Sequence, residues 1–394
     1  MTKVIKGGWL FDGSGSLLED QAVIIEGNRV KEVVSAASLP VEHSLSVIDA
    51  DGCTVLPGLI DCHVHICSSG VADGSKEAMD PDAMIALRAA NNARTLLHSG
   101  FTTIRNMGTK HQVDISVKQA IEYGYIIGPR IITSGEMLTM TGGHGWTAGR
   151  QVDGPDEARK GAREQLRAGA EVIKIMATGG VMTPGVEPGS PQLTIEEMRA
   201  AVEEAHKAGR RTATHAQGTT GIKNAILAGL DTIEHGIFLD DEVIQMMIDR
   251  GVALVPTLVA PYHIVQGGVE AGIPAYAVEK ANRVFDAHKA SFQKALAAGV
   301  IIAFGTDCGT PLNKPGVNAL EFELLVKYGM TPTQALLAAT SVAAKVCDRD
   351  QVGSVAPGKF ADLLIVKGNV LQDVTLLQNQ QNFQSVIKGG QCVK

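Results

Sequence analysis

The sequence has few cysteines, few aromatic residues and no long hydrophobic run. Only six of its 394 residues are cysteines, and none forms a CxxC pair, which excludes a dense disulfide framework and indicates reduced thiols. No segment approaches the roughly 20 apolar residues that a membrane helix needs. Residues 1–15 are too polar and too rich in glycine for a secretory signal, so we expect a cytoplasmic protein.

An excess of positive charge is also missing. The formal net charge is −7 and no dense run of lysine and arginine occurs, which argues against nucleic acid or an anionic membrane surface as the partner. Hydrophobic residues make up 45% and charged residues 20%, a composition typical of a folded globular protein. We therefore expect a small-molecule substrate. The pattern allows a homo-oligomer but identifies no interface.

Eight strand-like runs recur along the chain, and the intervals between them leave room for helices. Two of the predicted helices, residues 155–168 and 195–208, end just before a glycine. Alternation of strand and helix implies parallel pairing, and eight repeats imply closure, so the predicted fold class is α/β with a (β/α)8 TIM barrel. The strand-like runs are residues 59–66, 102–106, 130–133, 172–176, 212–215, 232–235, 253–257 and 301–306.

The two ends of the chain have a sequence pattern different from that of the central part. Both read as short alternating strands separated by turns. We expect them to form one small β-sandwich domain, with residues 1–57 as its N-terminal part and residues 354–394 as its C-terminal part. The barrel would then occupy residues 58–353 and finish with a helix over residues 332–346.

Histidines one residue apart close the first predicted barrel strand. Side chains alternate along a strand, so His63 and His65 point to the same face and could hold one metal ion, although a pair of structural histidines would have the same spacing. Barrel enzymes carry their chemistry at the C-terminal ends of their strands. Four further polar residues lie on or just after later strands, namely Lys174, His215, His235 and Asp307.

With these residues in place, the chain resembles the amidohydrolase superfamily over essentially its whole length. The matching motifs are residues 57–65, 172–174, 214–216, 233–236, 305–307 and 355–363. The segments 141–145 and 179–180 most resemble the branch of prolidase-like enzymes that cleave dipeptides or N-acyl amino acids, which includes hydrolases of amide-linked toxins such as ochratoxin. Some members of that branch carry a tyrosine two residues after the strand-five histidine, where this chain has Gln217.

The resemblance implies two divalent metal ions, most simply zinc, joined by a carboxylated Lys174. A buried, deprotonated lysine can form a carbamate, which presents two anionic oxygens. By the same resemblance His63, His65 and Asp307 would bind one ion, and His215 and His235 the other. A metal-bridging hydroxide would attack the substrate carbonyl, while Asp307 would carry its proton to the departing amine.

The loops after the strands carry the predicted substrate residues. His144 would hydrogen-bond the substrate, Gln217 and Tyr262 would line the pocket, and either His144 or Arg105 would hold a free carboxylate. Residues 179–192 are rich in glycine and proline and could form a lid beside Lys174. Alternation would turn Cys62 and Cys308 away from the site. The other histidines are expected at the surface: His43, His98, His111, His206 and His288.

Two other functions stay open. Enzymes similar to imidazolonepropionase or hydantoinase open cyclic amides, and residues 318–321 resemble the former, although that group works with one metal and lacks the carboxylated lysine. Hydantoinases share the bridging lysine, so Lys174 does not exclude them. A barrel that has lost catalysis and serves as a binding subunit is the third hypothesis, and the presence of every expected ligand counts against it.

Overall fold

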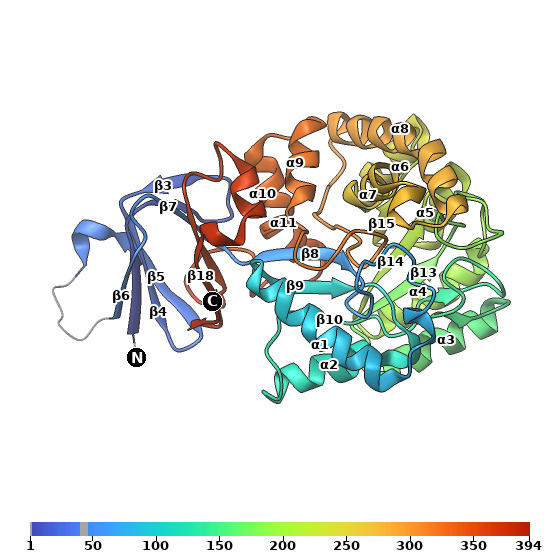
Figure 1. The fold of residues 1–394 in the computed structure, drawn as a ribbon, viewed down its shortest axis with the longest axis horizontal. Helices are drawn as coiled ribbons and strands as arrows, with labels where there is room; N and C mark the ends of the chain where they lie inside the picture. The colour runs from blue at the N-terminus through green and yellow to red at the C-terminus, as the bar shows by residue number, and fades with distance from the viewer. Residues whose placement is uncertain (1, 40–45) are drawn as a thin grey trace.

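The computed structural model describes residues 2–39 and 46–394, so His43 lies outside the described residues. The chain has two parts (Figure 1): strands from both chain ends lie on one side, and a larger α/β part lies on the other. The fold class α/β is confirmed by alternating parallel strands and helices in the larger part. No helix among the described residues is both long and apolar enough to cross a membrane.

Two sheets form the part built from the chain ends. Strands of the first sheet follow the order β5-β4-β1-β6, and those of the second follow β19-β18-β17-β7-β2-β3, so the C-terminal strands pair with N-terminal ones. A buried apolar cluster joins residues of both sheets, among them Ile5, Val23, Val55 and Leu363. The strands are β1 Thr2–Lys6, β2 Trp9–Phe11, β3 Leu17–Glu19, β4 Gln21–Glu26, β5 Arg29–Ser35, β6 Ser46–Asp49, β7 Cys53–Pro57, β17 Leu363–Lys367, β18 Phe383–Lys388 and β19 Gln391–Cys392.

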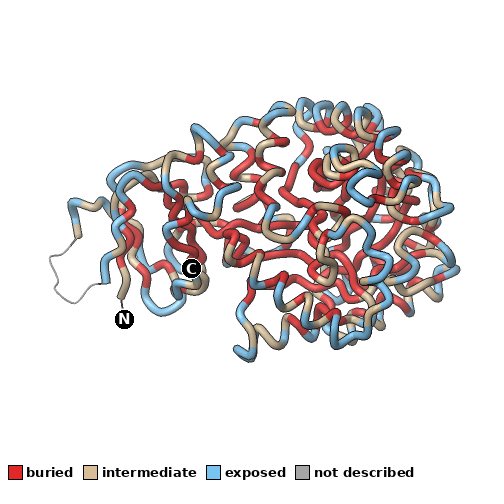
Figure 2. Tube along the Cα trace, in the orientation of Figure 1, coloured by how far each residue is buried: buried red, intermediate tan, exposed pale blue. Residues whose placement is uncertain are grey.

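Parallel strands form the centre of the larger part, and helices cover them. Figure 2 shows that buried residues follow the strands while exposed residues follow the outer faces of the helices. Every residue of β8 and of β13 is buried, as expected for parallel strands that are covered on both faces. The two sheets run β10-β9-β8 and β12-β11-β13-β14-β15-β16. Their strands are β8 Leu59–Val64, β9 Phe101–Asn106, β10 Arg130–Ile132, β11 Leu138–Thr139, β12 Arg150–Gln151, β13 Val172–Met176, β14 Arg211–Ala216, β15 Thr232–His235 and β16 Ala253–Val255.

The helices begin and end where local chemistry allows. The Thr194 hydroxyl accepts a hydrogen bond from the Glu197 amide, and the Glu197 carboxylate accepts one from the Thr194 amide, which forms a capping box at the start of α4. Gly169 ends α3 with φ 111°, a backbone conformation that glycine tolerates best. The helices are α1 Asp82–His98, α2 Val113–Glu122, α3 Pro155–Ala168, α4 Ile195–Lys207, α5 Thr219–Ala228, α6 Asp241–Arg250, α7 Val259–Gly267, α8 Ala275–Ala298, α9 Leu320–Lys327, α10 Pro332–Ala338 and α11 Ser341–Val346.

The last predicted strand, residues 301–306, is not a regular strand. Its backbone bonds to β16 through the Ala303 amide and the Leu254 carbonyl, 2.9 Å apart, and to β8 through the Phe304 carbonyl and the Cys62 amide, also 2.9 Å apart. The Phe304 amide, however, donates to the Ala338 carbonyl, which interrupts the ladder. The segment therefore lies between β16 and β8 without continuous pairing to either.

The predicted helix over residues 332–346 is divided into α10 and α11. The carbonyls of Ala338 and Ala339 accept hydrogen bonds from the backbone amides of Phe304 and Ile60, at 2.9 and 2.8 Å. Thr340, with φ −129° and ψ −101°, departs from helical geometry at that point. The prediction of one helix was wrong because β8 and the segment 301–306 use carbonyls that a continuous helix would need.

The cysteines near the predicted ligands are packing residues. Cys62 lies in a buried cluster with Ile60 and Cys347, and its sulfur is 3.5 Å from the Cys347 sulfur. Cys308 belongs to the main buried core. All six cysteines are free thiols, as the sequence predicted.

Candidate active site

Three residues with left-handed backbone aim side chains into one site at the strand ends. His235 has φ 74°, Thr257 φ 52° and Asp307 φ 57°, values that are uncommon for residues other than glycine. Neighbouring side chains of an extended strand point to opposite faces, but the left-handed turn at His235 brings its ring to the side on which Glu234 lies. Both side chains accordingly face His63, with the ring centroids of His63 and His235 5.2 Å apart.

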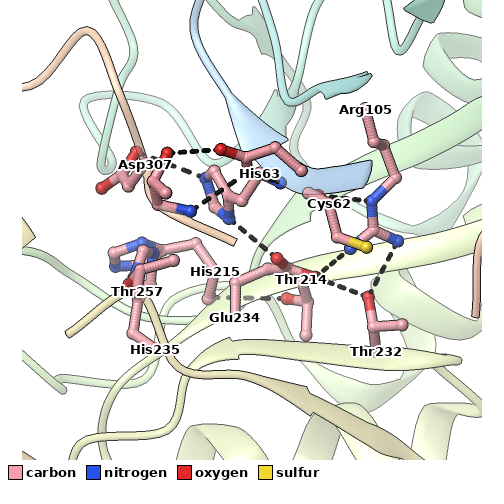
Figure 3. Close-up of polar contacts among 12 residues, drawn as sticks. Cys62, His63, Arg105, Thr214, His215, Thr232, Glu234, His235, Thr257 and Asp307 are labelled. Carbon is pink, nitrogen blue, oxygen red and sulfur yellow. Dashed lines mark hydrogen bonds and ion pairs between the residues drawn. The ribbon is translucent and has the colours of Figure 1, made fainter. Parts of the chain in front are cut away.

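His63, His65 and Asp307 form a compact group that could hold a metal ion. Their candidate ligand atoms all lie within 4.8 Å of one another. One Asp307 carboxylate oxygen is 3.1 Å from Nε2 of His65 and 3.4 Å from Nε2 of His63. The Asp307 amide donates to the His63 carbonyl at 2.7 Å, which fixes the backbone of one residue against the other. Figure 3 shows Asp307 and His63 facing each other.

His215 and His235 lie on the other side of the same space. His215 is the last residue but one of β14, His235 is the last residue of β15, and their ring centroids are 4.6 Å apart. Nδ1 of His235 is 2.7 Å from the Thr257 hydroxyl, which leaves Nε2 free for another partner. Burial lowers the pKa values of His63, His215 and His235 well below the ordinary value for histidine. The rings are therefore neutral, the form of histidine that binds metals.

Lys174 is a buried amine without a partner. Its side chain projects from β13, the residue is 1% exposed, and Nζ forms no hydrogen bond with any described residue. Burial lowers the pKa of Lys174 to about 8, which favours the neutral amine more than in water. An amine of this kind is the form of lysine that reacts with carbon dioxide, so the donor set fits the expected carboxylated residue.

Glu234 and Arg105 form a buried ion pair behind His63 that the sequence reasoning missed. Glu234 accepts from Nδ1 of His63 at 2.7 Å, from the Arg105 guanidinium at 3.0 Å and from the Thr232 hydroxyl at 2.5 Å (Figure 3). Arg105 also donates to the Cys62 carbonyl at 2.6 Å. A carboxylate only accepts, so Nδ1 of His63 carries its proton and Nε2 is free. The sequence feature that could have revealed this pair is Glu234 itself, an acidic residue next to His235 inside a buried strand.

This arrangement corrects the expectation that Arg105 could hold a substrate carboxylate. Its side chain is 1% exposed and does not line the cavity, and its donors are already engaged. His288 was also placed wrongly at the surface. It is buried on α8, lines the cavity and contacts the His235 carbonyl through Nε2 at 3.0 Å. A single histidine in a long helix gave no indication of the strand end against which it packs. His111 and His206 are exposed, as expected, and His98 is half-buried.

A second buried carboxylate, Asp61, ties the first strand to the last segment. It accepts from the Thr306 hydroxyl at 2.6 Å, from the Asn318 amide at 2.8 Å and from the His63 backbone at 3.0 Å. Burial raises the pKa of Asp61 to about 6. These contacts hold the backbone of His63 and that of Asp307 in a fixed relation, although residues 301–306 form no regular strand.

A cavity of about 340 Å³ opens above these side chains. The six residues predicted as metal ligands all line it, and so do His144 and Gln217. His144 contacts the Thr183 hydroxyl through Nδ1 at 2.8 Å, and Oε1 of Gln217 is buried without a partner among the described residues. Apolar side chains form much of the wall: Met137, Met176, Val181, Met182, Ile237 and Ile264.

Tyr262 is not brought to the cavity. It lies on α7, where Ala260, Pro261 and Ile264 line the cavity, and it packs against the main core. Successive residues of a helix are rotated by about 100° about its axis, so the side chain of Tyr262 points away from the face on which Pro261 and Ile264 line the cavity. The placement gives no support to substrate contact by Tyr262.

Helix α8 holds the segment 179–192 beside the cavity. Tyr276 donates to the Met182 carbonyl at 3.0 Å, and Nζ of Lys280 donates to the Thr183 carbonyl at 2.8 Å. Arg283 pairs with Glu187 at 3.0 Å. The predicted lid segment thus contributes Val181, Met182 and Thr183 to the cavity wall.

Comparisons with known proteins agree with this site. The model of the amidohydrolase family matches residues 54–393. The chain is 32% identical to the ochratoxinase of Aspergillus niger over 423 aligned residues, which cover 99% of this chain and 86% of the relative. A crystal structure of that ochratoxinase superposes with a TM-score of 0.89 at 30% identity, covering 100% of this chain and 95% of the other.

A crystal structure of a Xaa-Pro dipeptidase with methionine bound in its active site is similar over the full length of both chains. It superposes with a TM-score of 0.93 at 35% identity. Both similar enzymes carry names of amide-bond hydrolases, and the family match spans far more than half of the chain. This protein therefore belongs to the amidohydrolase family and is a hydrolase that acts on amide bonds.

Proposed function

We propose that the protein hydrolyses the C-terminal amide bond of dipeptides or N-acyl amino acids, including amide-linked toxins such as ochratoxin, in a metal-dependent reaction. The observation that carries this proposal is the convergence of four histidines and one aspartate on the partnerless amine of Lys174, at the base of one cavity. A structural cluster would satisfy that amine with protein acceptors.

The donor set fits two divalent ions. His63, His65 and Asp307 would hold one ion, His215 and His235 the other, and a carboxylated Lys174 would join them. Imidazole, carboxylate and carbamate ligands suit zinc, and such ions, when bound, would activate water at neutral pH and polarise the scissile carbonyl. The hydrogen bond from His63 to Glu234 keeps Nε2 of His63 free for binding.

The chain's own residues would manage protons and orientation. Asp307 is 3.1 Å from Nε2 of His65 and lines the cavity, so its carboxylate can accept the proton of the attacking water and pass it to the departing amine. The partnerless Oε1 of Gln217 can accept a hydrogen bond from a substrate N–H group. His144, neutral and beside Thr183, can donate a hydrogen bond from Nε2.

The apolar wall supports a substrate with a hydrophobic side chain. Methionine side chains adapt to ligands of different shapes, and Met137, Met176 and Met182 contribute three of them. The methionine bound by the similar dipeptidase is itself an apolar amino acid with a free carboxylate. Both points favour release of apolar amino acids from the C-terminal side of the substrate.

We also propose the finer architecture. The bonds from residues 301–306 to β16 and to β8, and the 3.2 Å bond from the Val172 amide to the Thr133 carbonyl after β10, support one closed (β/α)8 barrel over residues 58–353. The shared buried cluster of the two terminal sheets supports a small β-sandwich of residues 1–57 and 354–394.

Amino acid release from a panel of substrates tests the proposed function. The panel holds dipeptides, N-acyl amino acids, ochratoxin and cyclic amides such as hydantoins, and each is offered to zinc-loaded and to chelated protein. Metal-dependent release of a C-terminal amino acid is expected, with apolar residues preferred. Turnover of cyclic amides alone would replace the proposal with the imidazolonepropionase-like or hydantoinase-like function. Turnover that survives chelation would contradict the metal site.

A further inference from the structure

The cavity contains one cation that the proposed chemistry does not use. Among the described residues that line it, two are lysines and none is an arginine. Lys174 is buried at the base, between the histidines. Lys110 is half-buried and lies at the start of η3, a short 3-10 helix over Lys110–Gln112. A substrate that ends in a free carboxylate needs a charged partner, because removing an ion from water is costly unless it is paired.

The two residues first expected to hold that carboxylate do not have the required charge or access. Arg105 is enclosed with Glu234 behind His63. His144 lines the cavity, but its Nδ1 already contacts the Thr183 hydroxyl at 2.8 Å and its ring packs against that of His215, with the ring centroids 4.2 Å apart. Its Nε2 can donate one hydrogen bond, but an imidazole lacks the permanent positive charge of a lysine ammonium. Lys110 is left as the positive charge available at the cavity wall.

The backbone places Lys110 close to the reacting centre. The Gly108 carbonyl is 3.4 Å from Nδ1 of His65, and Gly108, Thr109 and Lys110 all line the cavity. Two residues of chain span at most about 7 Å, so the Cα atom of Lys110 lies within that distance of the Cα atom of Gly108, whose carbonyl contacts His65. A C-terminal carboxylate lies a few bonds from the scissile carbonyl, which matches this separation.

The turn that carries Lys110 is strained and anchored. His111 and Gln112 have φ values of 53° and 57°, two consecutive left-handed residues that are not glycine. Such residues are unfavourable and persist only where the surrounding contacts enforce them. The contacts here are His111 with Asp82 at 2.9 Å and Gln112 with Gln165 at 3.1 Å. The fold thus maintains an unfavourable backbone that keeps Lys110 at the cavity.

The charges around Lys110 leave its ammonium available. Among the described residues, Nζ of Lys110 forms neither an ion pair within 4.0 Å nor a hydrogen bond. Glu77 also lines the cavity, but it accepts from the Ser69 amide at 3.0 Å and lies 3.5 Å from Arg88, which balances its charge. Asp82 is engaged by His111. No carboxylate of this group competes for Lys110.

We propose that Lys110 binds the free carboxylate of the substrate and so determines the preference for substrates with an unblocked C-terminus. The proposal rests on the proposed function for the identity of the scissile bond. It adds that the cavity recognises the α-carboxylate by an ion pair at the turn that follows β9. Lys110 is a specificity residue here, and the reaction steps remain with the residues at the strand ends.

The test compares N-acetyl-L-phenylalanine with its C-terminal amide, on zinc-loaded wild type and three variants. Lys110→Met removes the charge and keeps much of the apolar stem, and Lys110→Arg preserves the charge. Lys76→Met is the matched control, because Lys76 is exposed on the neighbouring segment and does not line the cavity. We expect Lys110→Met to raise KM for the acid about 10- to 100-fold at nearly constant kcat and to leave KM for the amide unchanged. Lys110→Arg should recover most of the loss.

Calorimetric binding of N-acetyl-L-phenylalanine to the same four proteins separates this proposal from the proposed function. If wild type hydrolyses neither compound and none of the dipeptides of the panel, the proposed function fails, and weaker binding of the acid to Lys110→Met alone would still support the anchor. An unchanged preference for the acid over the amide in Lys110→Met, in KM or in binding, would overturn the assignment. An equal loss of affinity for the acid in Lys76→Met would also overturn it, because the overall electrostatic field of the protein surface would then explain the effect.

Discussion

Replacing Glu234 by glutamine should weaken metal binding and stability together, for two separable reasons. The carboxylate accepts from Nδ1 of His63 and from Arg105 at the same time. In Glu234→Gln one side-chain oxygen becomes an NH2 donor. If the oxygen stays on Arg105, the new donor faces His63 and forces Nδ1 to accept, which moves the ring proton to Nε2, the atom beside Asp307.

The two effects have different magnitudes. Loss of the partner that orients a metal-binding histidine typically costs 10- to 100-fold in metal affinity. The uncompensated charge of Arg105, which is 1% exposed, costs about 3 to 5 kcal/mol. With an unfolding entropy of about 2.1 cal/mol/K per residue, 394 residues give about 0.8 kcal/mol/K, so the midpoint of thermal unfolding should fall by about 4 to 6 °C.

Competitive zinc titration and calorimetry on metal-free protein measure the two effects independently. Glu242→Gln, which breaks the exposed pair between Glu242 and Lys223, is the control and should change neither value. A lower midpoint with unchanged zinc affinity would refute the argument that Glu234 sets the tautomer of His63. Unchanged values in both measurements would refute the buried ion pair as well.

Three further changes probe other parts of the site. Asp307→Asn should lower kcat by about 10²- to 10⁴-fold with an unchanged circular dichroism spectrum, and near wild-type turnover would refute its role as proton carrier. Lys174→Ala should bind fewer than two metal ions by elemental analysis, with partial recovery of activity in short carboxylates, whereas unchanged metal content would refute the bridge. Burial raises the pKa of Glu321 to about 8, so its stabilising proton is fully present below about pH 4 and lost as the pH rises toward 8. Urea unfolding of Glu321→Gln should therefore show a flatter decline in stability between about pH 5 and 8 than wild type, and parallel curves would contradict this.

Strands with strong apolar periodicity could be predicted from the sequence, and residues with long-range partners could not. The strands over residues 172–176 and 232–235 have the predicted bounds, because both are short buried runs between clear helix signals. Residues 301–306 look equally apolar, yet Phe304 bonds to the end of α10 rather than continuing a ladder. The local hydrophobic pattern does not show whether the Phe304 amide bonds to a neighbouring strand or to the remote carbonyl of Ala338.

The same division applies to the candidate site. The histidines, Lys174 and Asp307 could be proposed because each stands on or just after a predicted strand within a short motif, and the structure brings all six together. Arg105 could not be assigned, because its partner Glu234 lies 129 positions away along the chain. His288 was misplaced for a similar reason, since the carbonyl it contacts belongs to β15. Each error concerns a pairing across the interior, which only the three-dimensional structure specifies.

The division of the cavity between strand ends and outer segments has an evolutionary consequence. Most of the residues proposed for chemistry stand on backbone that is left-handed or buried in the parallel strands, where almost every exchange would cost stability. The cavity residues outside the strands lie on other elements. Lys110 lies on the turn after β9, Met182 on the segment 179–192, and Ile264 on α7. Related enzymes can therefore change their substrate specificity by substitutions at these outer positions while they keep the same catalytic mechanism. A mutational library restricted to them is the shortest route to a new substrate range.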